Sequence, residues 1–199
     1  MLTHPTLQSL KSMKLEGMAQ ALQEQLDSGQ VKELAFEERL GLLVDREATH
    51  RDNKGFNRRL TRAKLKQNAA LEDLDYSHPR KLDASLVRSL AACDWVRERH
   101  NLIITGPTGV GKTFLACALA HQACRVGFSA LYTKASRLLQ ELVVAKGDGR
   151  YLRMLDALAK TEVLILDDWG LEPPSADQAI PPARCVLGSR AKGVARVAR

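Results

Sequence analysis

The stretch Gly106-Pro-Thr-Gly-Val-Gly-Lys-Thr113 decides the fold of this chain, because it matches the phosphate-loop pattern G-x-x-x-x-G-K-[ST] at every fixed position. The apolar run 101–105 precedes it, and the helix-forming run 114–120 follows it. A strand that leads through a glycine-rich turn into a helix arranges backbone N–H groups and the positive helix end around phosphate oxygens. The sequence therefore predicts a nucleotide phosphate site at this turn.

The residues of this loop have defined roles toward a nucleotide. The glycines let main-chain N–H groups approach phosphate oxygens without a Cβ in the way. Lys112 supplies a full charge to the β- and γ-phosphates and is a predicted catalytic residue, while the Thr113 hydroxyl is a predicted Mg²⁺ ligand. The predicted cofactors are ATP and Mg²⁺. The predicted ATP-binding residues are Gly106, Pro107, Thr108, Gly109, Val110, Gly111, Lys112 and Thr113.

A second motif, Glu162-Val-Leu-Ile-Leu-Asp-Asp168, is an apolar run that ends in two carboxylates. Such a run is typical of a strand buried on both faces of a parallel sheet. Asp167 is predicted to hold the Mg²⁺ shell, and Asp168 is the predicted catalytic acid that polarises the attacking water. Glutamate is more usual at the position of Asp168, and its longer side chain reaches further. We therefore expect ATP hydrolysis to be slow or to rely on an intervening water. The alternative is that both acids only cap the next turn.

Composition limits the remaining possibilities. The 199 residues are 45% hydrophobic, which allows one packed domain and an appendage. No apolar run approaches the roughly 20 residues of a membrane span, and the first residues do not resemble a secretory signal. The four cysteines lack C-x-x-C spacing, so we expect neither a cysteine metal site nor a disulfide framework, and a cytoplasmic location. The net charge of +7 favours a polyanionic partner.

The chain divides into three predicted regions. Residues 1–79 show helical spacing of apolar residues in three segments (7–26, 34–47 and 56–63) and are expected to be all-helical. Residues 80–171 alternate strands (102–105, 129–133 and 163–167) with helices (83–95, 112–125, 136–144 and 151–159), which predicts an α/β parallel-sheet core. Residues 172–199 are rich in proline and arginine, and we expect a disordered basic tail.

The third helical segment of the first region is strongly basic. Its cations are suited to lie along the phosphate backbone of double-stranded DNA, with an affinity that falls steeply with salt. The alternative is a solvated helix face. The predicted DNA-binding residues are Arg58, Arg59, Arg62, Lys64 and Lys66.

Four segments together resemble one family. They are Phe56-Asn-Arg-Arg-Leu60, Leu71-Glu-Asp-Leu-Asp75, Gly106–Thr113 and Leu164-Ile-Leu-Asp-Asp-Trp-Gly-Leu171. This combination resembles the IstB-like transposition helper ATPases, which are AAA+ proteins related to the DnaC-type helicase loaders. The resemblance implies a P-loop NTPase core, ATP-dependent assembly on DNA, recruitment of a transposase, and a homo-oligomer with nucleotide between subunits.

The resemblance also implies features that the last region does not show. The AAA+ strand order is 5-1-4-3-2, so a fourth strand with a polar sensor separates the first and third strands, and an arginine finger and a fifth strand follow. After Pro173 no candidate for these is legible. We therefore expect a core incomplete at its C-terminus, with a gap beside the first strand, and interpret the change as a truncated or frameshifted reading frame.

Three functions follow from this reading. The first is an ATP-binding helper of DNA transposition that binds target DNA and recruits or activates a transposase. The second is a DnaC-like helicase loader. The third is a truncated remnant that binds DNA or ATP without hydrolysis.

Overall fold

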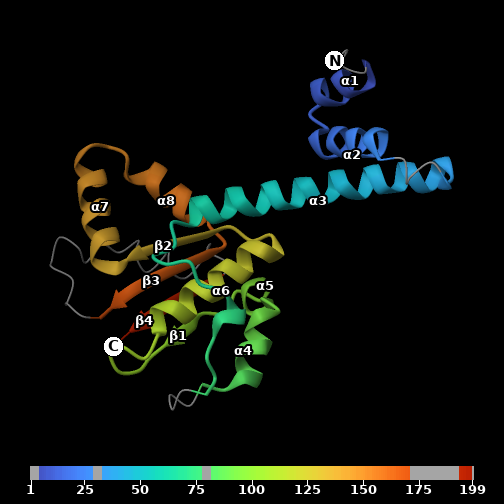
Figure 1. Cartoon of the computed structure of the whole chain (residues 1–199). Coiled ribbons are helices and arrows are strands. Elements are labelled where there is room, and N and C mark those ends of the chain that lie inside the picture. The colour runs from blue at the N-terminus through green and yellow to red at the C-terminus, as the bar shows by residue number, and fades with distance from the viewer. Residues whose placement is uncertain (1–4, 29–32, 78–81, 171–192, 199) are drawn as a thin grey trace. The chain divides into compact units, whose positions relative to one another are not determined.

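The computed structural model describes residues 5–28, 33–77, 82–170 and 193–198. The chain forms two compact units, residues 1–57 and residues 58–199, which are described here one at a time (Figure 1). The boundary falls within one helix, α3 (Phe36–Ala63).

The first unit is helical, as predicted, but its helix boundaries differ from the prediction. The segment 7–26 forms two helices, α1 (Pro5–Ser12) and α2 (Glu16–Asp27), because Lys14 adopts a left-handed backbone with φ of 61°. Leu7, Leu10 and Ala19 form their shared core. The two later segments, expected as separate helices, belong to the single helix α3.

A buried acid and a glycine join α2 to α3 within the first unit. The Glu47 carboxylate, on α3, accepts a hydrogen bond from the backbone N–H of Met18 (3.1 Å), in the first turn of α2, and another from Arg51 Nε (2.7 Å). The hydrogen bond from Arg51 is the largest cause that lowers the pKa of Glu47. A Cβ on Gly17 would lie 2.8 Å from the α3 backbone, so only glycine permits this close approach.

The second unit contains the predicted α/β core. After the end of α3 come η2 (Leu71–Asp73), α4 (Ala84–Ala91) and α5 (Asp94–Arg97). The core follows as β1 (Leu102–Ile104), α6 (Lys112–Val126), β2 (Ala130–Lys134), α7 (Ala135–Gly147), α8 (Tyr151–Ala159), β3 (Val163–Trp169) and β4 (Gly193–Ala198). Asp83 caps α4 by accepting from two backbone N–H groups, and Gly127 ends α6 with a φ of 116°. The predicted helix 83–95 is divided into α4 and α5, because Cys93 has a left-handed φ of 61°.

The sheet is parallel throughout, with the order β1-β4-β3-β2 (Figure 1). The expected gap beside β1 is therefore wrong, because residues 193–198 supply a strand that pairs with both β1 and β3. The predicted disordered tail is wrong for these residues, and its remainder, 172–192 and 199, lies outside the described residues. The sequence Gly-Val-Ala-Arg-Val-Ala hides the strand, since Arg196 interrupts an already short apolar run.

Helices cover both faces of the sheet. Leu131, Leu164 and Leu166 pack with α7 and α8 in one cluster. Their neighbours along the strands point to the opposite face, where Tyr132 packs with Cys117 and Ala118 of α6. This two-sided cover explains why β3 is buried over five consecutive residues, as a fully apolar run predicts. Within the described residues, no helix is long and apolar enough to cross a membrane.

Candidate functional site

The glycine-rich loop lies between β1 and the first residue of α6, where the sequence predicts it. Gly106, Gly109 and Gly111 have φ values of 151°, 87° and 91°, which L side chains rarely adopt. Lys112 Nζ donates to the carbonyl oxygens of Gly106 and Pro107, both at 2.7 Å. Those bonds hold the lysine ammonium inside the loop, beside the N-terminus of α6.

The acid that ends the apolar strand meets the loop, as predicted. Thr113 Oγ1 donates to Asp167 Oδ2 at 3.1 Å, although the two residues are 54 positions apart in the chain. Asp167 is only 2% exposed, which is rare for a carboxylate without several donors. A buried carboxylate oxygen beside a threonine hydroxyl is a donor set that fits Mg²⁺.

Two further side chains contact Asp167, and the sequence did not single out either contact. The Tyr132 hydroxyl donates to Asp167 Oδ2 at 2.5 Å, and Lys66 Nζ lies 3.8 Å from the same oxygen. Burial and then the bond to Asp167 raise the pKa of Tyr132, so the hydroxyl keeps its proton. A polar tyrosine inside the predicted strand 129–133 was the one available signal for the first contact.

The two consecutive acids reach the same cleft because the strand is irregular there. In a regular strand, neighbouring side chains point to opposite faces. The β3–β4 register shifts between Leu166 and Trp169, and Asp168 has a left-handed φ of 57°. Such a bulge changes the direction of a side chain, and aspartate tolerates the left-handed backbone conformation better than most residues. Asp168 forms an ion pair with Lys134 at 2.9 Å.

These groups line one cleft with a volume of about 370 Å³. Its described lining residues are Lys66, Gln67, Thr108, Gly109, Gly111, Lys112, Thr113, Phe114, Asp167 and Asp168. Five of the eight predicted loop residues and both predicted acids therefore line one cleft, together with a lysine that the sequence assigned to DNA, whereas Gly106, Pro107 and Val110 are not among its described lining residues.

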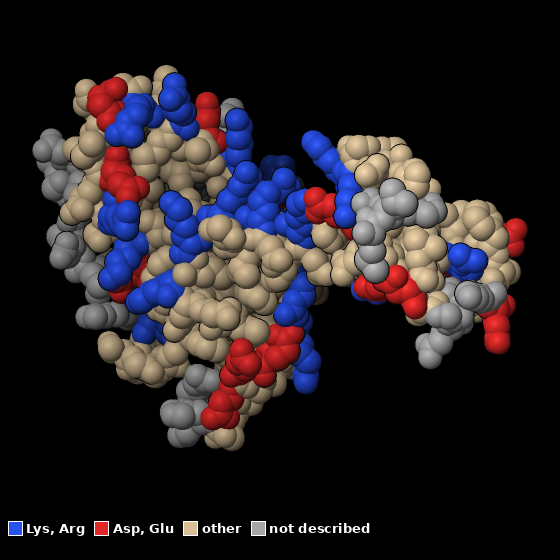
Figure 2. Space-filling view, turned by 45° about the horizontal axis from the view of Figure 1, so that its top comes forward, with Lys and Arg blue, Asp and Glu red and all other residues tan. Residues whose placement is uncertain are grey.

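The predicted DNA-binding residues do not form one group. Figure 2 shows Lys and Arg side chains gathered over the C-terminal part of α3. Arg58 and Arg62 are exposed there, but Arg59 donates through Nε to the Cys124 carbonyl oxygen at 2.8 Å and so holds the end of α6. The prediction that Lys64 and Lys66 lie on this helix is wrong, since α3 ends at Ala63. Lys64 is exposed, and Lys66 reaches the cleft.

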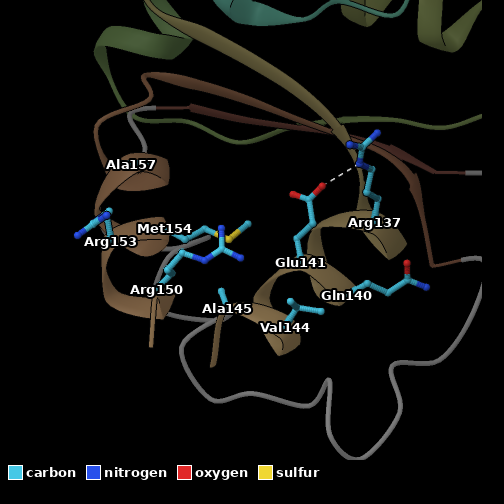
Figure 3. Close-up of a pocket in the computed structure, with 9 residues that line it drawn as sticks. All are labelled: Arg137, Gln140, Glu141, Val144, Ala145, Arg150, Arg153, Met154 and Ala157. Carbon is cyan, nitrogen blue, oxygen red and sulfur yellow. Dashed lines mark hydrogen bonds and ion pairs between the residues drawn. The ribbon is translucent and has the colours of Figure 1, made fainter. Parts of the chain in front are cut away.

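A second hollow, of about 600 Å³, lies between α7 and α8 (Figure 3). Arg137, Arg150 and Arg153 surround it, and Arg137 Nε donates to Glu141 at 2.8 Å. Its other lining residues include the apolar side chains of Val144, Ala145, Met154 and Ala157. The hollow lacks a glycine-rich loop and a pair of acids among its described lining residues, so its size does not make it the nucleotide site.

Comparison with known proteins identifies the family. The model of the IstB-like ATP binding proteins matches residues 8–181. The chain belongs to this family. An ATP-binding protein of insertion sequence IS1162 from Pseudomonas fluorescens, so named, is 56% identical over 172 residues, which are 86% of this chain and 74% of that protein. A Sinorhizobium fredii protein, also named for an insertion sequence and ATP binding, is 48% identical over 173 residues, covering 87% and 71%.

Solved structures agree with this IstB-like assignment at the level of the fold. AMPPCP-bound DnaA from Aquifex aeolicus matches with a TM-score of 0.57 and 20% identity, over 68% of this chain and 43% of the DnaA chain. This chain thus spans less than half of that relative's length. The DnaC helicase loader matches with a TM-score of 0.53 and 23% identity, over 71% and 79%. The predicted resemblance to IstB-like proteins and helicase loaders, and the P-loop fold class, are confirmed.

Proposed function

We propose that this chain binds Mg·ATP in the cleft of Lys112 and Asp167 and acts as the ATP-dependent DNA-binding helper of an insertion sequence. The observation that carries the proposal is the meeting of Thr113 and Asp167 at 3.1 Å, beside a loop whose lysine already faces inward. Membership of the IstB-like family and the insertion-sequence names of the relatives support it.

Different groups of the chain have different roles in binding ATP. Main-chain N–H groups of the loop and the N-terminus of α6 face the phosphates, and the Lys112 ammonium adds a full charge. Thr113 and Asp167 would hold Mg²⁺, which neutralises charge on the phosphate oxygens when it is bound. Tyr132 keeps the Asp167 carboxylate oriented through the 2.5 Å hydrogen bond.

Hydrolysis depends on Asp168. This carboxylate lines the cleft but is paired with Lys134, so it polarises a water only if that pair opens. An aspartate held in this way supports slow turnover. Turnover that disappears in Lys112→Ala would exclude the reading of the chain as a remnant without hydrolysis.

DNA binding is assigned to Arg58, Arg62 and Lys64. All three are exposed, and no side-chain hydrogen bond or ion pair joins any of them to another residue in the described parts of the chain. Arg59 and Lys66 are set aside because each already contacts a group of the nucleotide-binding unit. Free cations in one short segment suit a phosphate backbone.

The partners follow from the same reading. A transposase is the expected protein partner, because the relatives are named for insertion sequences. A homo-oligomer on double-stranded DNA is expected, with the cleft completed by a neighbouring copy. The alternative is a helicase loader, which the fold likeness to DnaC favours, and binding to a replicative helicase in place of the transposase would decide for it.

The test is DNA binding with and without Mg·ATP, measured by fluorescence anisotropy on a short duplex at several salt concentrations. The triple variant R58Q/R62Q/K64Q should bind more weakly and lower the slope of log affinity against log salt by about 2–3. The matched control K11Q/R88Q/K160Q removes the same charge from other exposed positions and should keep most of the affinity. Equal losses in both variants would remove the basic segment from the proposal.

A further inference from the structure

Lys66 is a residue of the nucleotide cleft that the motifs do not account for. Its ammonium lies 3.8 Å from Asp167 Oδ2, and it lines the cleft together with Lys112. The side chain of Lys66 is 51% exposed, while that of Asp167 is 3% exposed. The half-exposed ammonium of Lys66 therefore lies beside the buried carboxylate of Asp167.

Packing of its neighbours places Lys66 beside the cleft. Leu65 and Ala69, on either side of it, pack into the same cluster as Cys117, which is fully buried in α6. The side chain of Lys66 itself is half-exposed, and its four-carbon length allows the ammonium to reach either the carboxylate or a phosphate in the cleft.

Lys66 and a magnesium ion would compete for one oxygen atom. Cations within a few ångströms of each other repel strongly in a partly buried site. Once Asp167 is neutralised by Mg²⁺, the nucleotide phosphates offer the Lys66 ammonium a strong negative charge within the same cleft. We propose that Lys66 competes with Mg²⁺ for Asp167 and moves to the ATP phosphates when the metal binds. This inference rests on the proposed binding of ATP in this cleft.

Lys66 is also close in the chain to the residues proposed to bind DNA. Ala63 is the last residue of α3, and Lys66 is the third residue after it. A change of partner by Lys66 therefore takes place next to Arg62 and Lys64, which are assigned to DNA.

The test measures binding of a fluorescent ATP analogue by the full chain, first in EDTA and then as Mg²⁺ is added. Lys66→Met should weaken binding by about ten-fold at saturating Mg²⁺, because the charge-assisted contact to phosphate that Lys66 gains in the metal-bound state is lost. It should also lower the Mg²⁺ concentration at half-maximal effect by about three-fold or more, since Asp167 loses its competing cation. Lys64→Met, which removes the same charge from two residues away, should resemble the wild type in both measurements. Lys66→Gln provides a second neutral variant, with thermal denaturation of every variant as the folding control.

The outcomes separate the inference from the function on which it rests. Lys66 variants that match Lys64→Met in both measurements would overturn the inference alone. A wild-type chain that binds no ATP analogue at any Mg²⁺ concentration would overturn the proposed function and the inference with it.

Discussion

Removing one hydroxyl group tests how Asp167 is kept charged and buried. Tyr132→Phe keeps the ring in its cluster with Phe114 and Cys117 but deletes the 2.5 Å hydrogen bond to Asp167. Hydrogen bonds to charged groups contribute about 1.5–3 kcal/mol, and the lower end applies because Thr113 still donates to the same oxygen. We therefore expect the free energy of unfolding of the nucleotide-binding unit to fall by about 1.5 kcal/mol, which lowers Tm by about 3–6 °C.

Urea denaturation followed by tryptophan fluorescence measures the free energy of unfolding of residues 58–199, the unit that contains Tyr132. Both tryptophans of the chain, Trp95 and Trp169, belong to residues 58–199. The matched control is Tyr76→Phe, which makes the same chemical change at a tyrosine that is 43% exposed, and it should leave the transition unchanged. A Tyr132→Phe variant as stable as the control would refute the view that this hydroxyl stabilises the buried carboxylate.

Three further predictions concern packing and charge. Gly17→Ala should destabilise the helical unit by about 1–3 kcal/mol, because the new Cβ would overlap the α3 backbone; hydrogen exchange in residues 5–57 measures this. Glu47 has a folded-state pKa below its ordinary value of 4.5, so its contribution to stability is present above that pH and is lost as pH falls through the folded value. Glu47→Gln should therefore weaken the unit at pH 7 and flatten its acid denaturation, whereas an unchanged acid transition would contradict the assignment. Arg59→Met should cost about 1 kcal/mol through the lost bond to the Cys124 carbonyl, and an unaltered melting curve would count against that contact.

The sequence predicted the nucleotide core because its signals are local. The fixed glycines stand where the loop needs positive φ angles that other residues rarely adopt, and Gly127 marks the end of the helix that follows. The apolar run before Asp167 is long enough to read as a buried strand, and β3 lies where it was expected. Elements whose positions follow from local backbone geometry were thus placed correctly.

Features that depend on tertiary contacts were not predictable in the same way. The last strand, β4, has only a short apolar run that Arg196 interrupts, so only its pairing with β1 and β3 reveals it. The sequence grouped Lys66 with the cations of a basic helix, but α3 ends at Ala63 and Lys66 lines the cleft beside Asp167. Tyr132 becomes part of the site only because parallel pairing sets it opposite Ile165, two residues from Asp167.

Calorimetric titration of the full chain with ATP in the presence of Mg²⁺ tests the central claim most directly. The wild type should bind ATP at one site per chain, and Lys112→Ala should bind at least about 100-fold more weakly, because the charge that faces the phosphates from within the loop is gone. Both proteins should melt at similar temperatures. A wild type without measurable affinity, or a Lys112→Ala variant with undiminished affinity, would contradict the account.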